Sequence, residues 1–377
     1  MKRSTDRILT THTGSLPRPP ELIESLRLID SGAPVDQALF QRQTRDAVDQ
    51  VVKLQHDAGI DVLNDGEEGK VGYSTYIKDR CTGFEGENRS TMVQAEGRDF
   101  PEWAAARPRP SFTRPACSGP IAWKDFDAVK RDIENLRAAT QNAGAAEVFM
   151  SAASPGVIAI FLTNNYYPSD ETYLEAIANV MRDEYKAIVD AGFILQLDCP
   201  DLAMSRHNRF ADLSLPEFRK KVELHVAVLN DAINGITADR MRTHLCWGNY
   251  EGPHQLDVEL RDIIDLVLKA NTEGISFEGA NPRHENEWRV FREVKLPDDK
   301  VLIPGVIDST TNFIEHPEVV ADRIERYAGV VGKERVIAGT DCGFGTFAAG
   351  STVFPGIAWA KLKALSDGAA LATKELA

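Results

Sequence analysis

The chain has 377 residues, of which 43% are hydrophobic and 27% are charged, an ordinary globular composition with ample material for a large core. Its formal net charge is −14, which argues against a general nucleic-acid binder and against binding to an anionic membrane surface. Five widely spread cysteines argue against a disulfide framework, and no apolar run is long enough to span a bilayer. Because no signal-peptide pattern follows Met1, these features predict a cytoplasmic protein.

A recurring pattern in the sequence is a short strand-like run with a polar or glycine-containing end, followed by an amphipathic helix. The predicted strands are 8–12, 61–65, 147–151, 193–198, 242–246, 274–278, 301–308 and 335–339. The predicted helices are 38–58, 130–143, 170–191, 215–233, 256–270 and 317–331. Eight such strand units in series predict an α/β fold, a (β/α)8 TIM barrel, with a doubly wound open sheet as the alternative.

Residues 70–147 interrupt this pattern with aromatic, proline-rich and glycine-rich pieces such as Phe100-Pro-Glu-Trp103 and Arg107-Pro-Arg-Pro110. We expect an insertion after the second strand, containing a hairpin and a helix, that lies over one mouth of the barrel. The sequence therefore predicts a single catalytic barrel domain over residues 1–377, with an insertion at about 70–147.

Polar residues stand at or near the carboxyl ends of the predicted strands, where barrels of this type carry their chemistry. They are His12, Asp65, Glu67, Ser154, Asp198, His244, Cys246, Glu278, Asp308, Asp341 and Cys342. Such a distribution is unusual for a purely structural pattern and predicts an active site at this end of the barrel.

His244 and Cys246 stand two residues apart near the end of the fifth predicted strand, so their side chains point to the same face. Glu278 and Cys342 end two later strands, and thiolate, imidazole and carboxylate are the usual ligands of zinc. We therefore predict a Zn2+ site; the alternative is a satisfied core histidine with inert buried cysteines. Two thiolates reduce the acidity of the ion, so an added thiol would bind as a thiolate and stay nucleophilic.

Two acidic residues are candidates for substrate binding. Glu67 follows a strand directly, and Asp198 ends an apolar run so that its carboxylate is expected to face the barrel mouth and bind a cationic amine. The alternatives are a solvated loop acid and a structural cap. His254, near the metal strand, is a candidate partner of a metal ligand. Four arginines follow strand ends and are surface residues or anchors for an anionic substrate tail: Arg18, Arg206, Arg209 and Arg283.

The chain resembles the C-terminal, catalytic barrel of cobalamin-independent methionine synthases and their short single-barrel relatives. The matching segments span nearly the whole chain: Thr10-Thr-His-Thr-Gly-Ser-Leu-Pro17, Leu63-Asn-Asp-Gly-Glu67, Gln196-Leu-Asp-Cys-Pro200, Thr243-His-Leu-Cys246, Ser276-Phe-Glu278 and Asp341-Cys-Gly343. The resemblance implies that zinc is ligated by His244, Cys246, Glu278 and Cys342. It also implies that Ser15, Glu67 and Asp198 hold the amino-acid part of a homocysteine-like thiol, whose thiolate attacks the alkyl group of a donor, a methylated folate in this family.

Three departures from the family pattern concern the donor side. The family's full-length enzymes carry a further, N-terminal barrel that helps to bind folate, and these 377 residues contain no counterpart. Met204 stands where the family has an acidic residue that contacts the pterin. Thr310 stands where the family has a histidine proton donor, two residues after Asp308, which is itself a further catalytic candidate. The departures weigh against methylfolate more than against thiol alkylation.

The prediction is thus zinc-dependent alkyl transfer, of methyl in the first place, from an alkyl donor to a small-molecule thiol, without nucleic acid or membrane as partner. Donors other than methylfolate, such as a methylated corrinoid protein or a small methyl ester or thioether, stay open. One alternative is the chemistry of epoxyalkane:coenzyme M transferase, a short single barrel that needs no pterin pocket and for which Arg18 or Arg206 would anchor the sulfonate. Another is a metal-free decarboxylase of the related uroporphyrinogen type. A third is a non-catalytic zinc-binding or thiol-binding protein. The oligomeric state is not predicted.

Overall fold

Eight parallel strands lie side by side in the order β1-β8-β7-β6-β5-β4-β3-β2 in this computed structural model, which describes residues 1–88, 94–107, 112–348 and 352–377. The strands are β1 (Leu9–Thr10), β2 (Val62–Leu63), β3 (Glu147–Ala153), β4 (Ile194–Asp198), β5 (Met241–His244), β6 (Gly274–Phe277), β7 (Val301–Ile307) and β8 (Ile337–Thr340). Every strand from β2 to β7 pairs with the next one in the sequence, and β8 pairs with β1.

The sheet curls until its two edge strands meet. The backbone amide of Asp61 donates to the carbonyl oxygen of Thr10 at 3.2 Å, and the Thr10 amide donates to the Asp61 carboxylate at 2.9 Å. These bonds join the entry of β2 to β1 and bring the sheet nearly to closure. The predicted (β/α)8 barrel is confirmed, and the doubly wound alternative is wrong because its strand order would reverse within an open sheet.

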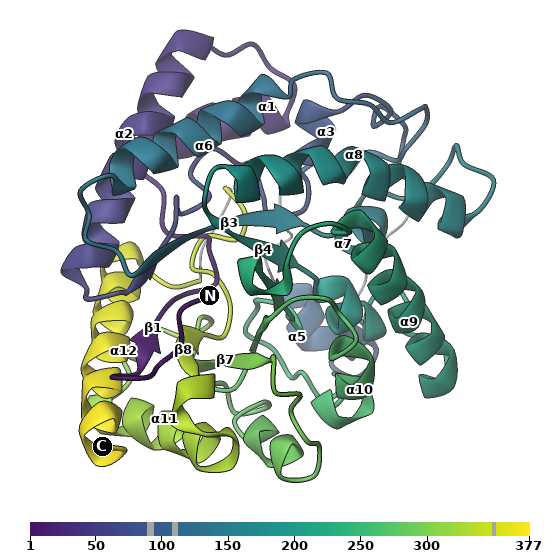
Figure 1. Cartoon of the computed structure of the whole chain (residues 1–377). Coiled ribbons are helices and arrows are strands. Elements are labelled where there is room, and N and C mark those ends of the chain that lie inside the picture. Colours follow the sequence, from purple (N-terminus) through teal and green to yellow (C-terminus); the bar gives the residue numbers. More distant parts are fainter. Residues whose placement is uncertain (89–93, 108–111, 349–351) are drawn as a thin grey trace.

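Helices surround the strands on all sides (Figure 1). Along the chain, α2 packs on α6, α6 on α8 and α8 on α9, while α11 packs on α12 and α12 returns to α2. Their bounds are α2 (Gln37–Asp57), α6 (Asp127–Thr140), α8 (Asp170–Asp190), α9 (Leu215–Ala232), α11 (Pro317–Val331) and α12 (Pro355–Glu375). Local sequence specifies their starts: the Ser169 side chain accepts from the Thr172 amide, and Ser214 and Glu217 form a capping box.

The main departure from the predicted helices lies between β5 and β6. The helix expected at 256–270 is wrong: the chain forms only a 3-10 turn, η4 (Leu260–Asp262), and a single turn, α10 (Ile264–Val267). The physical reason is tertiary, since Asp257 accepts hydrogen bonds from two histidines and so holds residues 254–259 near the strand ends. After β6 the covering element is a 3-10 helix, η5 (Glu287–Arg292).

Outside the insertion, three described α-helices were not predicted from the sequence: α1 (Pro20–Asp30), α7 (Pro155–Phe161) and α12. Ser154, one of the predicted strand-end residues, caps α7 by accepting from the Val157 amide at 3.0 Å. Its position at a strand end is therefore explained by helix capping.

The inserted segment between β2 and β3 contains three short helices, α3 (Ile77–Arg80), α4 (Glu96–Asp99) and α5 (Pro101–Ala106), before α6 begins. Isolated antiparallel bridges join Cys81 to Trp123 and Gly86 to Ala116. Other contacts link the segment to the loops after β4 and β8: the Ala95 amide donates to the His207 carbonyl, and Gly72 bridges to Phe347. Residues 108–110 of the proline-rich piece lie outside the described residues. Among the described residues, no helix is long and apolar enough to cross a membrane.

Candidate metal and substrate site

Three of the predicted metal ligands come together at the carboxyl end of the barrel. One ligand atom each from His244, Cys246 and Cys342 lies within 4.8 Å of the other two, and all three side chains are buried. The two sulfur atoms are 3.6 Å apart, and Cys342 Sγ is 4.0 Å from His244 Nε2. His244 is the last residue of β5, while the two cysteines follow the ends of β5 and β8.

The donor set fits a tetrahedral zinc ion. Sulfur ligands at ~2.3 Å from zinc lie about 3.8 Å apart in tetrahedral geometry, close to the observed spacing of the sulfurs. Burial is the main cause that lowers the pKa of His244 to about 3, so its imidazole is neutral and offers a lone pair. Its Nδ1 atom is buried without a hydrogen-bond partner. The neighbouring Cys342 sulfur, and then burial, raise the pKa of the Cys246 thiol, which is the effect that a bound cation would reverse.

Glu278, the fourth predicted ligand, is not part of this compact group. Its Oε1 accepts from the Trp247 backbone amide at 2.7 Å, and its Oε2 accepts from Asn281 Nδ2 at 2.8 Å. Burial, and then the charge of Cys246 beside it, raise the pKa of the Glu278 carboxyl well above its usual value. We call His244, Cys246 and Cys342 the thiol group. The Glu278 carboxylate therefore lies next to the thiol group, and its role as a metal ligand stays a prediction.

Glu67 and Asp198 lie near each other in the same part of the barrel. Both are buried, and burial followed by the charge of Glu67 raises the pKa of Asp198 well above its usual value. Asp198 stands opposite His244 in the ladder between β4 and β5. Glu67 has a left-handed backbone, with φ of 57°, and its Oε2 atom has no hydrogen-bond partner. Two buried carboxylates, one of which has an oxygen without a hydrogen-bond partner, are suited to an ammonium group.

Ser15, the third predicted substrate residue, lies against the segment that carries Cys342. Its carbonyl oxygen accepts from the Phe344 amide at 2.8 Å, and a Cβ atom on Gly343 would collide with its hydroxyl. Glycine at 343 thus permits a close approach between the loops after β1 and β8. The structure places all three predicted substrate residues, Ser15, Glu67 and Asp198, in buried positions at the carboxyl end of the barrel.

A buried arginine beneath the site was not predicted. The guanidinium of Arg242 donates to Gln196 Oε1 at 2.8 Å, to Thr11 Oγ1 at 2.9 Å and to the His12 carbonyl at 2.9 Å. Gln196 in turn donates to Asp198 Oδ1 at 2.8 Å. Arg242 therefore orients the side-chain amide of Gln196, and this amide orients the Asp198 carboxylate. Strand alternation offered a signal, because Arg242 and Gln196 stand two residues before His244 and Asp198 on their strands.

Two further residues missed in the sequence hold the loops around the thiol group. Asn281 donates to both Glu278 and Asp341, and Asp341 accepts backbone amides of Gly279 and Ala280 at 2.8 Å each. Asp341 is thus a strand-end acid that anchors the loop after β6. Asn249, the second of these residues, ties three loops together. It donates to the Gly343 carbonyl and the Thr346 hydroxyl, and it accepts from Ser309.

Asp308 caps its own loop. Its Oδ1 accepts from the amide and hydroxyl of Thr310, and its Oδ2 accepts from the amide and hydroxyl of Thr311. Both carboxylate oxygens are therefore occupied, and Thr310 directs its hydroxyl to Asp308. Met204, the other departure from the family pattern, is buried next to the metal strand, where its amide donates to the Cys246 carbonyl at 3.0 Å.

The remaining candidates have local partners. Arg18 is buried and donates to the carbonyl oxygens of Glu67, Lys70 and Gly345, while Arg206 donates to the carbonyls of Phe210 and Ala211. Both guanidinium groups are thus engaged by backbone carbonyls of neighbouring loops. Three other candidates lie elsewhere: Arg209 and Arg283 are exposed, and His254 contacts Asp257 and the Tyr250 carbonyl.

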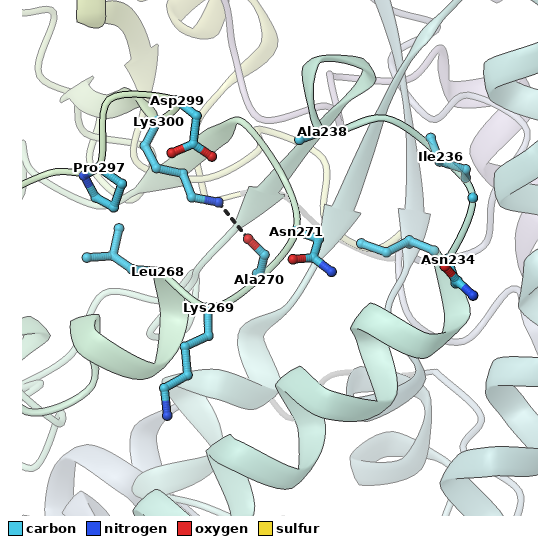
Figure 2. A pocket seen from close by; sticks show the side chains of 12 residues that line it. Asn234, Ile236, Ala238, Leu268, Lys269, Ala270, Asn271, Pro297, Asp299 and Lys300 are labelled. Atoms are coloured by element: carbon cyan, nitrogen blue, oxygen red, sulfur yellow. Dashed lines mark hydrogen bonds between the residues drawn. The ribbon is translucent and has the colours of Figure 1, made fainter.

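A hollow of about 460 Å³ lies at the opposite end of the barrel (Figure 2). Its lining includes residues that precede β5, β6 and β7, such as Ala238, Asn271 and Lys300. Lys300 donates to the Ala270 carbonyl at 2.6 Å across it. Because it is formed at the amino ends of the strands, this hollow is separate from the thiol group.

Both the sequence and the structure of the chain are similar to those of known proteins. The family model described as the catalytic domain of cobalamin-independent synthase matches residues 161–355 of the sequence. Curated relatives named methionine synthase include a Sulfolobus acidocaldarius protein, 27% identical over 340 residues that cover 89% of this chain and 85% of the relative. Another, from Saccharolobus islandicus, is 26% identical over 371 residues and covers 97% and 95%.

Two solved structures share the fold. A B12-independent methionine synthase from Shewanella, in complex with selenomethionine, superposes with a TM-score of 0.75 at 22% identity and covers 98% of this chain and 99% of that one. A putative vitamin-B12-independent methionine synthase from Listeria monocytogenes gives a TM-score of 0.64 at 17% identity and covers 97% and 98%. The barrel described above is therefore an arrangement found in known proteins.

Proposed function

The chain belongs to the cobalamin-independent methionine synthase family, and on this premise we propose that it is a zinc-dependent methyltransferase that methylates the thiol of homocysteine or a close analogue. Family membership supports the reaction type. The buried acids beside the thiol group support the kind of acceptor, and they are the observation that carries the proposal.

His244, Cys246 and Cys342 would hold the zinc ion, with Glu278 as the proposed fourth ligand. When bound, the ion would lower the pKa of the acceptor thiol and hold it as a nucleophilic thiolate near neutral pH. The chain's own contribution is to fix the ligands. Asn281 orients Glu278, and Asn249 fixes the loop that carries Cys342 by donating to the Gly343 carbonyl at 2.7 Å.

Glu67 and Asp198, with Ser15, would bind the amino-acid part of the acceptor. An ammonium group between two buried carboxylates supplies the missing hydrogen-bond donors and offsets the charge that raises the pKa of Asp198. A sulfonate thiol such as coenzyme M has no ammonium, and the same two acids would repel its anionic tail. The acid pair thus favours homocysteine over the epoxyalkane:coenzyme M alternative.

The residues that we assign to the binding of the methyl donor are apolar and aromatic. Met204 replaces the acid that contacts the pterin in the family. Tyr73 packs against Phe161 and Phe347 with ring centroids 5.8 and 5.6 Å apart. Burial, and then the charges of nearby groups that include the cysteines at 246 and 342, raise the pKa of the Tyr73 phenol. We propose that the methyl donor is held by these apolar and ring contacts and makes no contact with a carboxylate at position 204.

The test separates amine recognition from thiol binding. Cobalt-loaded protein would be titrated with homocysteine, with 4-mercaptobutyrate, which lacks the amine, and with coenzyme M, while thiolate-to-cobalt absorption is followed. Asp198→Asn should weaken homocysteine at least about tenfold, because a hydrogen bond to a charged group contributes roughly 1.5–3 kcal/mol, and should leave 4-mercaptobutyrate unchanged. Asp190→Asn, at an exposed carboxylate at the end of α8, is the matched control.

Tighter binding of coenzyme M than of homocysteine would contradict the proposal and favour epoxide-type thiol alkylation. Equal weakening of both carboxylate thiols by Asp198→Asn would remove the amine-binding role. Absence of any thiol-dependent absorption would leave a closed, non-catalytic metal site.

A further inference from the structure

A second group of potential metal ligands lies outside the thiol site. One ligand atom each from Glu96, His207 and Asp257 lies within 4.8 Å of the other two, and all three residues are buried. They come from three separate segments: Glu96 begins α4 of the insertion, His207 follows β4, and Asp257 lies between β5 and β6. We call these three residues the Asp257 cluster.

Each member of the Asp257 cluster has one buried polar atom without a hydrogen-bond partner: Glu96 Oε2, His207 Nδ1 and Asp257 Oδ1. The residues are 0%, 1% and 6% exposed, so water at the surface does not satisfy these atoms. His207 Nδ1 lies 2.9 Å from Asp257 Oδ1, yet the pair does not have hydrogen-bond geometry. Neighbouring ligands at ~2.1 Å from one metal ion lie about 3 Å apart in octahedral geometry, which matches this spacing.

The other atoms of the cluster are held in place by hydrogen bonds. Asp257 Oδ2 lies 2.8 Å from His254 Nδ1 and 3.0 Å from His284 Nε2. Glu96 Oε1 accepts from the Tyr250 hydroxyl at 3.3 Å. One oxygen of each carboxylate is thus used for orientation while the other is left open, which is the usual arrangement of metal ligands and their supporting residues.

The hydrogen bonds around the cluster leave Glu96 open to a cation. His254 and His284 each place both ring nitrogens against oxygen acceptors, among them Asp257 Oδ2. Among the described residues, the hydrogen bond to Glu96 comes from a phenol, so this buried carboxyl group has no cationic hydrogen-bond partner.

We propose that Glu96, His207 and Asp257 bind a second divalent metal ion, separate from the thiol group. Two carboxylates and one imidazole are oxygen and nitrogen donors of the kind that first-row transition ions such as Zn2+, Mn2+ or Fe2+ accept. Because the ligands come from the insertion and from two barrel loops, the ion fastens the insertion to the carboxyl end of the barrel. This inference does not rest on the proposed methyl transfer.

The experiment counts metal in the full chain after chelator treatment and dialysis against Co2+. A Cys246→Ser/Cys342→Ser chain removes the thiolate site and should retain about one cobalt per chain. Adding Glu96→Gln should weaken that binding at least about tenfold, and adding His207→Gln should do the same. Glu102→Gln, at an exposed carboxylate of α5 in the same insertion, is the matched control and should leave the count unchanged.

A second readout uses the unmodified thiolate site, in case the cysteine variant does not fold. The parent chain should bind two cobalt ions and the Glu96→Gln chain one, with the same thiolate-to-cobalt absorption in both. Metal should also slow amide hydrogen exchange of residues 94–107 in the parent more than in Glu96→Gln. A cobalt count of one in the parent, or a second ion retained by both Glu96→Gln and His207→Gln, would overturn the proposal.

Discussion

At the scale of single residues, the buried guanidinium of Arg242 sets the arrangement beneath the site. It lies 3.6 Å from the ring centroid of Phe149 and donates to three oxygen acceptors, none of them a carboxylate. Burial lowers its pKa to about 9, so it stays protonated near neutral pH. Because Gln196 links it to Asp198, the arginine positions the acid that we propose to bind the substrate amine.

Replacing Arg242 by lysine should therefore be destabilising. A single ammonium group cannot reproduce the planar fork, and at least one buried acceptor loses its donor, so the free energy of unfolding should fall by about 2–4 kcal/mol. Urea unfolding of Arg242→Lys measures this loss. Arg240→Lys is the control, since Arg240 is partly exposed and donates to one carbonyl. Equal free energies of unfolding for the two variants would show that the planar guanidinium of Arg242 is not needed for stability.

His12 provides a pH-dependent prediction at the same scale. Its Nε2 donates to Gln55 at 2.8 Å, its Nδ1 accepts from the Gly14 amide, and burial is the main cause that lowers its pKa to about 3. In the unfolded chain a histidine has a pKa of about 6.5. Between these values only the unfolded state is protonated, so the free energy of unfolding falls as pH falls, by about 1.4 kcal/mol per unit.

His12→Gln should remove this proton uptake. The slope of unfolding free energy against pH, measured by urea titrations between about pH 4 and 6, should be smaller than in the parent by up to about 1.4 kcal/mol per pH unit. His56→Gln replaces an exposed histidine, 59% exposed in its side chain, and should leave the slope as it is. Parallel slopes for the parent and His12→Gln would contradict the assignment.

At the scale of elements, α11 and α12 pack through a glycine. A Cβ atom on Gly368 would lie 2.8 Å from the Pro317 carbonyl and would collide with the Val320 side chain. Gly356, on the same helix, has open space around its Cβ direction. The two positions therefore form a matched pair on one element.

Gly368→Ala should lower the free energy of unfolding by about 1–3 kcal/mol, because the two helices are forced apart. Gly356→Ala should leave stability unchanged or raise it by up to about 1 kcal/mol through helix propensity. Thermal and urea unfolding of both variants measure the difference. A Gly368→Ala chain as stable as the parent would mean that the helices are not in close contact at this point.

The strands and helices show how much of the fold could be predicted from the sequence. Strands and long helices followed from local periodicity, as at α8 and α9, so the order of elements and the barrel were predictable. The helix expected at 256–270 is not formed because the contact of Asp257 with His284, which lies in another loop, outweighs local helical spacing. Such contacts join residues from different loops, and no periodicity records them.

Part of the candidate site was also predictable from local sequence patterns. Alternation along β5 identified His244 and Cys246, and strand ends identified Cys342, Glu67 and Asp198. The orientation of Glu278 depends on Asn281 and on the Trp247 amide, and the support from Arg242 depends on three other segments. These are tertiary hydrogen bonds, which one sequence does not reveal.

At the scale of the whole molecule, β1 and β8 come from opposite ends of the chain and pair directly, with Leu9 opposite Ile337. We propose on this basis that residues 1–377 form one catalytic barrel domain, with the insertion fastened over its carboxyl end. The resemblance to cobalamin-independent methionine synthases is confirmed by the family match. The central claim is then that this end of the barrel holds a metal ion to which a thiol substrate binds.

X-ray absorption at the zinc edge tests this claim most directly. The measurement uses the Glu96→Gln chain loaded with one zinc per chain. Because this variant lacks the second proposed metal site, the zinc signal comes from the site of His244, Cys246 and Cys342. We expect two sulfur ligands in the absence of substrate, from Cys246 and Cys342, and three when homocysteine is added. A chain that binds no zinc, or a sulfur count that homocysteine does not change, would contradict it.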